Sequence, residues 1–281
     1  MSESFVSLKA ECAPGQFTLS AEDGTPVLTQ HAADGCRPYL HPIHAPGGGG
    51  VLTEDRPSHH PWQHGLYIGL NDVNGIGFWK EGLQATTAAT DGSFDSRLLS
   101  GPHEIGTETS WEVATDYRDP DRALMLQDVQ RWTARASRTR LELDLEWTLL
   151  ARRDLVFGQY AYGGLFLRMP FRPDAGGQAI DSEGQSQDGR SARWVAVSMA
   201  LPDTGRTIQA VILDHPSNPG SPVHWRIDGE LGIGPTPSVS AAWSLADGQS
   251  RRFRYRLLVF PSPAEPAAIK AAWNRYAEVV Q

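Results

Sequence analysis

The sequence predicts an all-β protein, an antiparallel β sandwich that ends in a single C-terminal helix. Stretches in which apolar and polar residues alternate recur along the chain, and the clearest is 141–149, with Leu or Trp at every second position. Asp-Gly pairs and other turn signals separate nearly all of these stretches, and no strand–helix–strand alternation occurs. Alternation with a period of two is typical of antiparallel strands that bury one face. We therefore expect sheets packed face to face in one domain, 1–281.

Twelve segments have the composition and pattern of strands. Polar turn residues bound most of them, including Asp-Gly at 23–24, 91–92, 228–229 and 247–248, which favours hairpin connections. Residues 176–190 are polar and rich in Gly, Gln and Ser, and we expect a long surface loop there. The predicted strands are 5–10, 16–20, 37–44, 66–70, 107–117, 123–135, 141–149, 164–169, 192–201, 207–214, 223–227 and 251–260.

One helix is predicted, over about 263–281. Ser262 can cap its first turn, and Glu265 follows three residues later, which is the spacing of a capping box. Apolar residues then recur at helical spacing and predict a face that packs on a sheet. These residues are Ile269, Trp273, Tyr276 and Val280.

Composition narrows the class of protein. The 281 residues carry 33 acidic against 25 basic side chains, a net charge of −8, which argues against a nucleic-acid-binding protein. No apolar run approaches the roughly 20 residues of a membrane helix, and residues 1–9 do not resemble a secretory signal. We expect a cytoplasmic protein whose two cysteines, Cys12 and Cys36, are free thiols. We expect no cofactor, and the oligomeric state stays open.

The segment from His41 to His64 is the most informative part of the chain, since it holds five of the nine histidines. Histidine can transfer protons near neutral pH and can also bind metals. Four consecutive glycines, 47–50, lie in the same segment. They are not followed by Lys-Ser/Thr and open no helix, so they favour a turn between strands over a phosphate-binding loop.

Metal binding by these histidines is an alternative that the sequence leaves open. His60 and His64 have the i, i+4 spacing of a helical zinc pair, but Pro61 lies between them and the His-Glu-x-x-His pattern is missing. His59 and His60 are adjacent, and in extended backbone they would point to opposite sides. We therefore assign no metal ligand.

Two later stretches also place polar groups against apolar strands. Arg168 interrupts the apolar run 164–169, either as an ion pair at the edge of the core or as a donor to a ligand. The apolar strand 207–214 ends in Asp214-His215, with Asn218 close behind. Such an ending is typical of a cavity rim, although a proline-rich turn would explain the same residues.

The same stretches resemble a bacterial family labelled methane oxygenase PmoA. We do not carry oxygenase activity over, because subunits of particulate methane monooxygenase are membrane proteins. The order His64-Gly65-Leu66, Gly69, Trp79 is also similar to a motif of galactose-mutarotase-like supersandwich proteins. That resemblance implies a pair of histidines and a carboxylate around an anomeric carbon. The motifs that match the PmoA-labelled family are Arg37-Pro38-Tyr39, His41-Pro42, Pro46-Gly47-Gly48, Thr53-Glu54-Asp55, 58–67, Asp72-Val73-Asn74-Gly75, Phe78-Trp79 and Asp214-His215-Pro216.

Together these features predict a carbohydrate-active enzyme that uses histidine and carboxylate acid–base chemistry. We expect a mutarotase, epimerase or lyase whose partner is a small sugar or oxidised sugar. His60 or His64 is one acid/base, His215 is the second, and Asp214 is a base or orients one. The predicted substrate-binding residues are Arg37, His44, Trp62, Tyr67, Trp79, Arg168 and Asn218.

The sequence leaves open two other functions, and it leaves open a purely structural role for the aromatic residues. Trp62, Tyr67 and Trp79 can form a platform for a sugar ring, or they can simply pack in the core. A non-catalytic carbohydrate-binding module would need these aromatic residues but no reactive histidine. A histidine-ligated metal enzyme is the other alternative. The acidic side chains of 141–149 are Glu142, Asp144 and Glu146, and we expect them on a solvated face outside the site.

Overall fold

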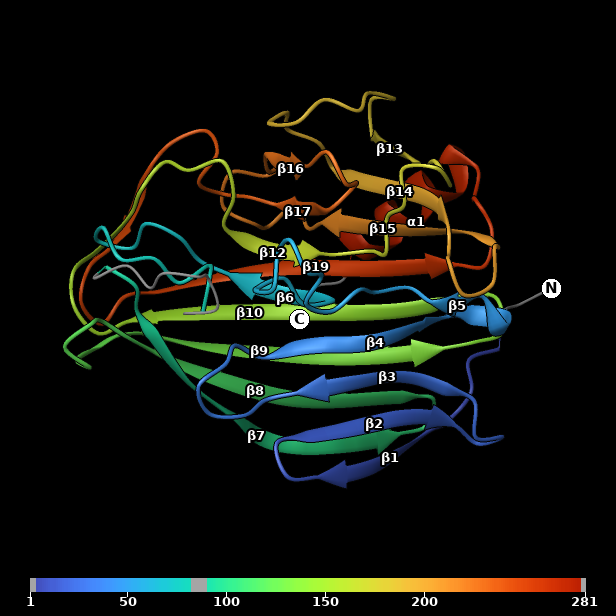
Figure 1. Ribbon diagram of the computed structural model, residues 1–281, viewed down its shortest axis with the longest axis horizontal. Helices are drawn as coiled ribbons and strands as arrows, with labels where there is room; N and C mark the ends of the chain where they lie inside the picture. Colours follow the sequence, from blue (N-terminus) through green and yellow to red (C-terminus); the bar gives the residue numbers. More distant parts are fainter. Residues whose placement is uncertain (1–3, 82–89, 279–281) are drawn as a thin grey trace.

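The computed structural model describes residues 4–81 and 90–278. Its strands form two large antiparallel sheets that lie one over the other (Figure 1), which confirms the predicted β sandwich. The first sheet has nine strands, ordered β1-β2-β3-β4-β6-β12-β17-β16 with β5 paired to β4. Its strands are β1 (Leu8–Ala13), β2 (Gln16–Ala21), β3 (Pro26–His31), β4 (Tyr39–Ala45), β5 (Gly50–Val51), β6 (Leu66–Gly69), β12 (Gly164–Leu167), β16 (Trp225–Ile227) and β17 (Ile233–Pro235).

The second sheet has eight strands, ordered β13-β14-β15-β19-β10-β9-β8-β7. A separate pair, β11 (Leu155–Phe157) and β18 (Trp243–Leu245), extends the sandwich at one end. The strands of the second sheet are β7 (Ser93–Ile105), β8 (Glu108–Arg118), β9 (Leu124–Ala136), β10 (Leu141–Ala151), β13 (Gln178–Asp181), β14 (Trp194–Ala200), β15 (Thr207–Asp214) and β19 (Ser250–Phe260).

The core lies between the two sheets, and strand β10 shows how the alternating pattern builds it. Leu143, Leu145 and Trp147 are each at most 2% exposed and belong to one cluster that also contains residues of the nine-stranded sheet. Strand β10 is paired along its length with β9 on one side and β19 on the other. The predicted strand 141–149 is therefore a central strand whose apolar face fills the sandwich.

The opposite face of β10 is less solvated than expected. Glu142 is buried, and Asp144 and Glu146 are half-buried. Asp144 lies 2.5 Å from Nε of Arg256 on β19 and 2.8 Å from Nη1 of Arg135 on β9. Arginines on both neighbouring strands thus pair with these acids and cover much of the face, which corrects the prediction of a solvated face.

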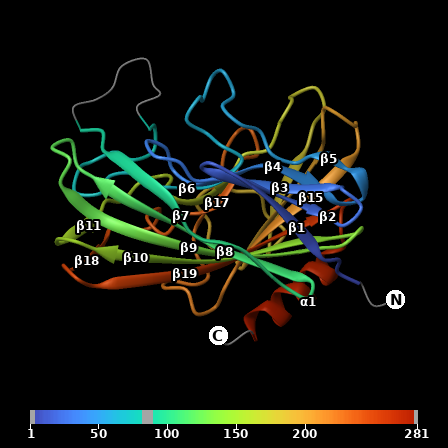
Figure 2. The same ribbon diagram turned by 90° about the horizontal axis from the view of Figure 1, so that it is seen from below.

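Helix α1 (Pro266–Ala277) covers part of the outer face of the eight-stranded sheet (Figure 2). Ile269 and Tyr276 are buried there and Trp273 is partly buried, as the helical spacing predicts, whereas Val280 lies outside the described residues. The predicted start is wrong. The helix begins at Pro266, and its N-cap, Glu265, makes no side-chain capping hydrogen bond, so no capping box forms. Pro266 accounts for this start, because proline suits the first helical position.

Other predictions are confirmed or corrected. Residues 46–50 turn the chain from β4 into β5, as expected of the glycine run. The predicted loop 176–190 contains a strand, β13, that pairs with β14. The sequence prediction also missed β3, β7 and four short strands of two or three residues, β5, β11, β17 and β18. Strand β3 has four consecutive buried residues, and the register of β7 shifts twice. Both cysteines are free thiols, as predicted. In the described part of the chain, no helix has the length and apolar character needed to cross a membrane.

Candidate functional site

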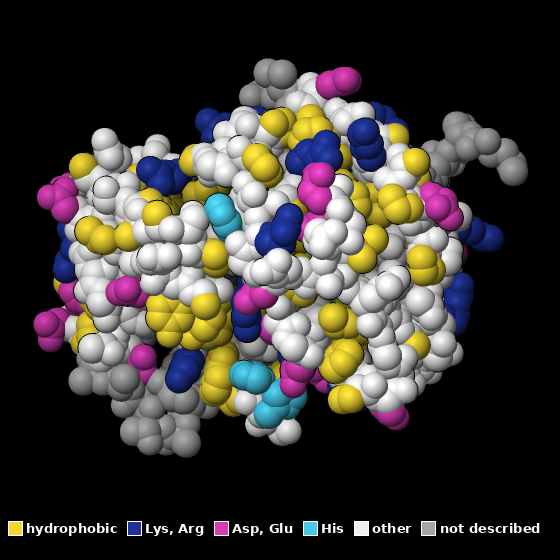
Figure 3. Space-filling model, turned by 90° about the horizontal axis from the view of Figure 1, so that it is seen from above, with side chains coloured by type: hydrophobic (Ala, Val, Ile, Leu, Met, Phe, Trp, Pro, Cys, Tyr) yellow, Lys and Arg dark blue, Asp and Glu magenta, His cyan; other side chains and the backbone are white. Residues whose placement is uncertain are grey.

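A cavity of about 290 Å³ lies over β6, β12 and the β16–β17 turn of the nine-stranded sheet. This volume is near the lower end of the roughly 300–1,000 Å³ that is usual for small-molecule sites. Figure 3 shows histidine, acidic and hydrophobic side chains close together on one face of the molecule. The lining residues come from four separate segments of the chain: His60, Trp62 and Gln63; Trp79 and Lys80; Tyr162 and Phe166; Arg226, Asp228, Gly229 and Glu230.

The floor of the cavity is aromatic because neighbouring strands turn alternate side chains outward. On β6, Leu66 and Ile68 belong to the core between the sheets, whereas Tyr67 belongs to a separate aromatic cluster. The ring of Trp79 lies 5.5 Å from that of Tyr67 and 4.5 Å from that of Tyr162. Trp79 is 5% exposed and Tyr67 only 1%. Trp79 and Phe166 of this cluster therefore line the cavity, while Tyr67 packs against both rings without lining it.

A buried ion pair between Arg37 and Glu81 supports this floor. Nε of Arg37 lies 2.9 Å from Oε1 of Glu81, and the Arg37 backbone N–H donates to the same oxygen at 2.7 Å. The guanidinium also donates to the backbone carbonyl of Trp79 and lies 4.7 Å from the centre of the Tyr67 ring. Arg37 thus fixes Trp79 from below and is not among the residues that line the cavity.

His64 extends the same buried network. Its Nε2 lies 2.6 Å from Glu81 and its Nδ1 lies 2.6 Å from Asp55, so both ring nitrogens are held by carboxylates. The ring stacks on Tyr39 at 4.3 Å. Burial favours the neutral form of Glu81, but Arg37 and His64 outweigh it and lower the pKa of Glu81 to about 2. His64 therefore orients carboxylates under the cavity floor and has no ring nitrogen directed at a ligand.

Arg168 lies at the edge of the cavity in a second ionic cluster. Its side chain is 1% exposed, lies 3.1 Å from Glu54 and forms an ion pair with Glu230. Arg172 lies 2.9 Å from the other carboxylate oxygen of Glu54. Of the two roles that the sequence leaves open for Arg168, the structure shows the ion pair at the edge of the core. Arg168 positions Glu230, which does line the cavity.

His60 is the predicted catalytic residue that lines the cavity. Its ring meets the ring of Trp62 edge-on at 5.5 Å and that of His59 at 4.8 Å. Its Nδ1 atom is buried and has no hydrogen-bond partner. Burial, followed by the nearby charge of His59, lowers the pKa of His60. An imidazole nitrogen without a partner is thus available beside the aromatic floor.

Asp214 lies elsewhere, at the end of β15 in the other sheet. It accepts hydrogen bonds from the side chains of Asn218 and Ser221, both at 2.8 Å, and from the backbone N–H of Val223 at 3.0 Å. Burial raises the pKa of Asp214 to about 6, against the opposing effect of these hydrogen bonds. Its contacts close the turn that follows β15.

His215 and His44 are also distant from the cavity lining. Nδ1 of His215 lies 2.7 Å from Oγ of Ser217, and its ring meets Tyr276 of helix α1 edge-on at 5.0 Å. Nε1 of Trp273 donates to the carbonyl of Asp214, which docks the helix at the same place. His44 lines a different groove, beside the glycine run. The structure therefore brings His60, Trp62 and Trp79 together but separates them from Asp214, His215, Asn218 and His44.

Several residues of the cavity escaped the sequence analysis. Lys80, Tyr162 and Arg226 carried no pattern that distinguishes them from surface residues. Asp228 and Glu230 flank Gly229, and the Asp-Gly pair was interpreted only as a hairpin turn. The pair does form a turn, since Oδ1 of Asp228 accepts the backbone N–H groups of Glu230 and Gly232. A turn that aims a carboxylate into a cavity has the same local sequence as any other turn.

Comparison with known proteins identifies a family but no activity. The model of a family of unknown function (DUF6807) matches residues 19–274. The resemblance to the methane oxygenase family PmoA is therefore wrong, since the matching family is one of unknown function. No curated protein matches the chain.

Several solved structures match the chain over most of its length. The Slr1438 protein from Synechocystis sp. PCC 6803 has 11% sequence identity and a TM-score of 0.42, with 93% of this chain and 97% of that chain covered. A galactose mutarotase related enzyme from Lactobacillus acidophilus has 8% identity and a TM-score of 0.40, with coverage of 92% and 99%. The GH36 α-galactosidase AgaB from Geobacillus stearothermophilus has 10% identity and a TM-score of 0.37, with coverage of 90% and 41%. At such values we infer neither substrate nor reaction from these proteins.

Proposed function

The chain belongs to the family of unknown function DUF6807, and we propose that it binds and converts a small sugar-like molecule in the cavity over β6 and β12. The observation that carries this proposal is the composition of the cavity. Aromatic side chains line it together with charged and amide groups. Sugars have an apolar face of C–H groups and a rim of hydroxyls, so they need both kinds of surface in one small site.

Two of the aromatic side chains that line the cavity remain partly exposed and can contact a ligand. Trp62 and Tyr162 are only partly buried against the aromatic cluster. Nζ of Lys80 lies 5.4 Å from the centre of the Trp62 ring, so a cationic donor stands next to a stacking surface. Gln63 and Arg226 add amide and guanidinium donors. Hydroxyl or carboxylate oxygens of a sugar or sugar acid are suitable partners for these donors.

The proposed reaction is an isomerisation, epimerisation or elimination, which requires one group to take a proton and another to supply one. His60 is the imidazole, and Glu230 one of the two carboxylates, that line the cavity. They replace the wider set predicted from the sequence, in which His60 or His64 was one acid/base, His215 was the second, and Asp214 was a base or oriented one. His64 lies in the buried network, and His215 packs against helix α1.

A thermal-shift screen of sugars and sugar acids, followed by calorimetry, tests the binding step. The substitution Trp62→Ala is expected to weaken binding by about fivefold or more, which corresponds to about 1 kcal/mol for a lost aromatic contact. Trp273→Ala is the matched control, because Trp273 is also partly buried but lies on helix α1. Equal losses in the two variants, or no sugar that binds, would overturn the proposal.

Proton NMR in D₂O tests the conversion step. Exchange between anomers or epimers, or uptake of deuterium at a sugar carbon, is expected with the wild-type chain and not with His60→Ala. A non-catalytic binding module is the second candidate, and it is favoured by the distance between His60 and the other predicted catalytic residues. That function predicts tight sugar binding without exchange or deuterium uptake.

A further inference from the structure

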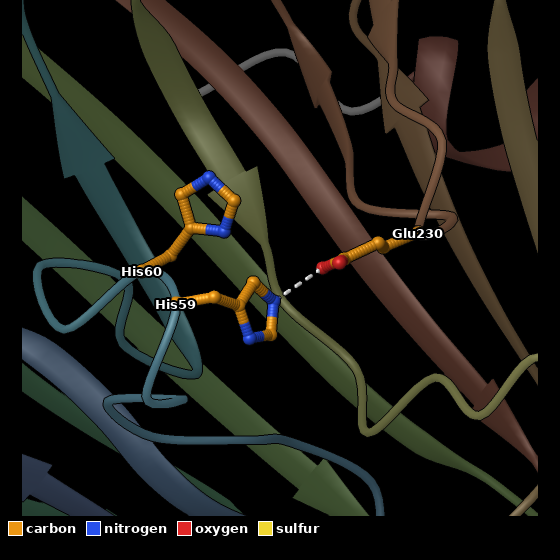
Figure 4. A group of neighbouring side chains, drawn as sticks. All are labelled: His59, His60 and Glu230. Carbon is orange, nitrogen blue, oxygen red and sulfur yellow. Dashed lines mark hydrogen bonds and ion pairs between the residues drawn. The ribbon is translucent and has the colours of Figure 1, made fainter.

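His59, His60 and Glu230 bring three potential metal ligands together at the edge of the cavity (Figure 4). Each offers one nitrogen or oxygen atom, and these atoms all lie within 4.8 Å of one another. The histidines belong to the loop before β6, and Glu230 belongs to the turn between β16 and β17. The group is therefore assembled only by the fold, from segments about 170 residues apart.

Backbone turns explain why two adjacent histidines can point to the same place. The backbone N–H of His60 donates to the carbonyl of Pro57 at 2.8 Å, and that of Gln63 donates to the carbonyl of His60 at 3.0 Å. Two successive turns thus replace the extended backbone that was expected, and the two imidazole rings lie 4.8 Å apart. Both imidazoles therefore lie near Glu230, although only His60 lines the cavity.

The donor set suits a transition metal such as zinc. Two imidazoles and one carboxylate are a common set of three protein ligands for catalytic zinc, which keeps a further position open for water or substrate. The side chains of His59 and Glu230 are 48% and 35% exposed, so solvent reaches the group. The buried Nδ1 of His60 has no hydrogen-bond partner and is free to act as a ligand.

The surroundings orient the carboxylate and balance the charge. Arg168 forms an ion pair with Glu230, and Nη2 of Arg168 lies 3.4 Å from Nε2 of His59. A carboxylate oxygen of Glu54 lies 3.1 Å from Arg168 and compensates the positive charge of the guanidinium. Hydrogen bonds to a ligating carboxylate are usual in metal sites, where they hold the ligand in position.

A bound ion would replace the hydrogen bond between His59 and Glu230, which is 2.9 Å long. Two ligands of one tetrahedral zinc lie ~3.3 Å apart, because zinc–ligand bonds are about 2.0–2.1 Å long. The His59–Glu230 separation must therefore widen by about 0.4 Å. The other two separations, which are at most 4.8 Å, must close by no more than about 1.5 Å. Rotation of the exposed His59 and Glu230 side chains can supply these shifts.

We propose that His59, His60 and Glu230 form a binding site for a divalent transition-metal ion of the zinc type, with its open position directed at the cavity. His60 and Glu230 also line that cavity. A bound ion would act there as a Lewis acid on a hydroxyl or carbonyl oxygen of the ligand. This last role rests on the proposed function, whereas metal binding by the three residues does not.

Calorimetric titration with ZnCl₂ tests the site, using untagged chain that has been stripped with a chelator. One equivalent is expected to bind. Loss of a partner outside the ligand shell costs about 10- to 100-fold in metal affinity, so His59→Ala, His60→Ala and Glu230→Gln are each expected to cost at least about 100-fold. His103→Ala is the matched control, because His103 is exposed on β7. Circular dichroism confirms that each variant is folded.

Substitution with Co²⁺ gives a second readout that needs no activity, since the visible spectrum of bound Co²⁺ reports its coordination. Spectra that change in His60→Ala and not in His103→Ala are expected. No stoichiometric binding, or equal affinity in the His59→Ala/His60→Ala double variant, would overturn the metal site. Trp62→Ala should weaken sugar binding and leave the affinity for Zn²⁺ unchanged. Zinc binding that fails while sugar binding persists would reject the metal site alone, and the opposite result would reject the proposed function alone.

Discussion

Nε2 of His64 lies 2.6 Å from a carboxylate oxygen of Glu81, and neither side chain is more than 1% exposed. The other oxygen of Glu81 is held by Arg37. This buried contact joins the histidine-rich loop to the segment that carries Trp79. The aromatic floor of the cavity thus rests on an ionic network whose residues do not line the cavity.

Replacing Glu81 by glutamine is expected to lower the free energy of unfolding by about 3–5 kcal/mol, the usual cost of removing one partner of a buried ion pair. The shape of the side chain is retained, but Arg37 loses its buried carboxylate partner. Urea unfolding measures the change. Glu183→Gln is the control, because Glu183 pairs with Arg193 at the surface and its loss should have little effect. A loss for Glu81→Gln as small as that of the control would contradict this account.

The free energy of unfolding is expected to depend on pH through the ionisation of Glu81. Arg37 and His64 overcome the effect of burial and lower its pKa from 4.5 to about 2 in the folded chain. A depressed pKa means that the folded state holds the charged form more strongly than the unfolded chain does. This contribution is complete above about pH 4.5 and is lost as the pH falls toward 2. Acid unfolding curves of wild type and Glu81→Gln should converge over that range, and parallel curves would refute the assignment.

Asp214 is expected to matter for stability and not for ligand binding. Asp214→Ala leaves the donors of Asn218, Ser221 and Val223 without their shared acceptor. Buried groups left unsatisfied cost about 1–3 kcal/mol, so urea unfolding should shift accordingly. Calorimetry with a sugar from the screen should give the wild-type affinity. A large loss of sugar affinity in a folded Asp214→Ala variant would show that Asp214 takes part in ligand binding.

Gly69 tests the packing under the cavity floor. A Cβ atom at this position would lie 2.5 Å from the ring of Trp79 and 2.6 Å from Nη1 of Arg37. Gly69→Ala is therefore expected to cost about 1–3 kcal/mol, as overpacking does, and to change the tryptophan fluorescence. Gly101→Ala is the control, since no atom lies within 4 Å of the added carbon. Identical stability and fluorescence in both variants would show that the floor is not tightly packed.

The regular part of the fold could be predicted because it follows a local pattern. Strand β15 was predicted with its observed ends, and β10 with its observed start, since one face of β10 alternates into the core. Strand β3 was missed because its consecutive buried residues show no alternation. The start of helix α1 was misplaced because Ser262 and Glu265 match the spacing of a capping box without forming one.

The candidate site was predictable only in part. The density of histidines drew attention to the loop before β6, and His60, Trp62 and Trp79 line one cavity. The structure does not bring His60 and His215 together, as the sequence predicted, because strand β15 lies in the other sheet and its end faces helix α1. Glu230 could not be found from the sequence, since its turn meets the histidine loop only through the order of strands in the sheet.

By itself the sequence determined the all-β class, most strands, the terminal helix and the loop that carries the histidines. These features depend on residue periodicity and turn chemistry, which act over a few neighbouring residues. The tertiary structure alone decided which side chains meet: His64 with Glu81, and His59 with Glu230. Such contacts join segments that are distant in the chain, and they are set by strand order and by the burial of charge, neither of which leaves a local pattern.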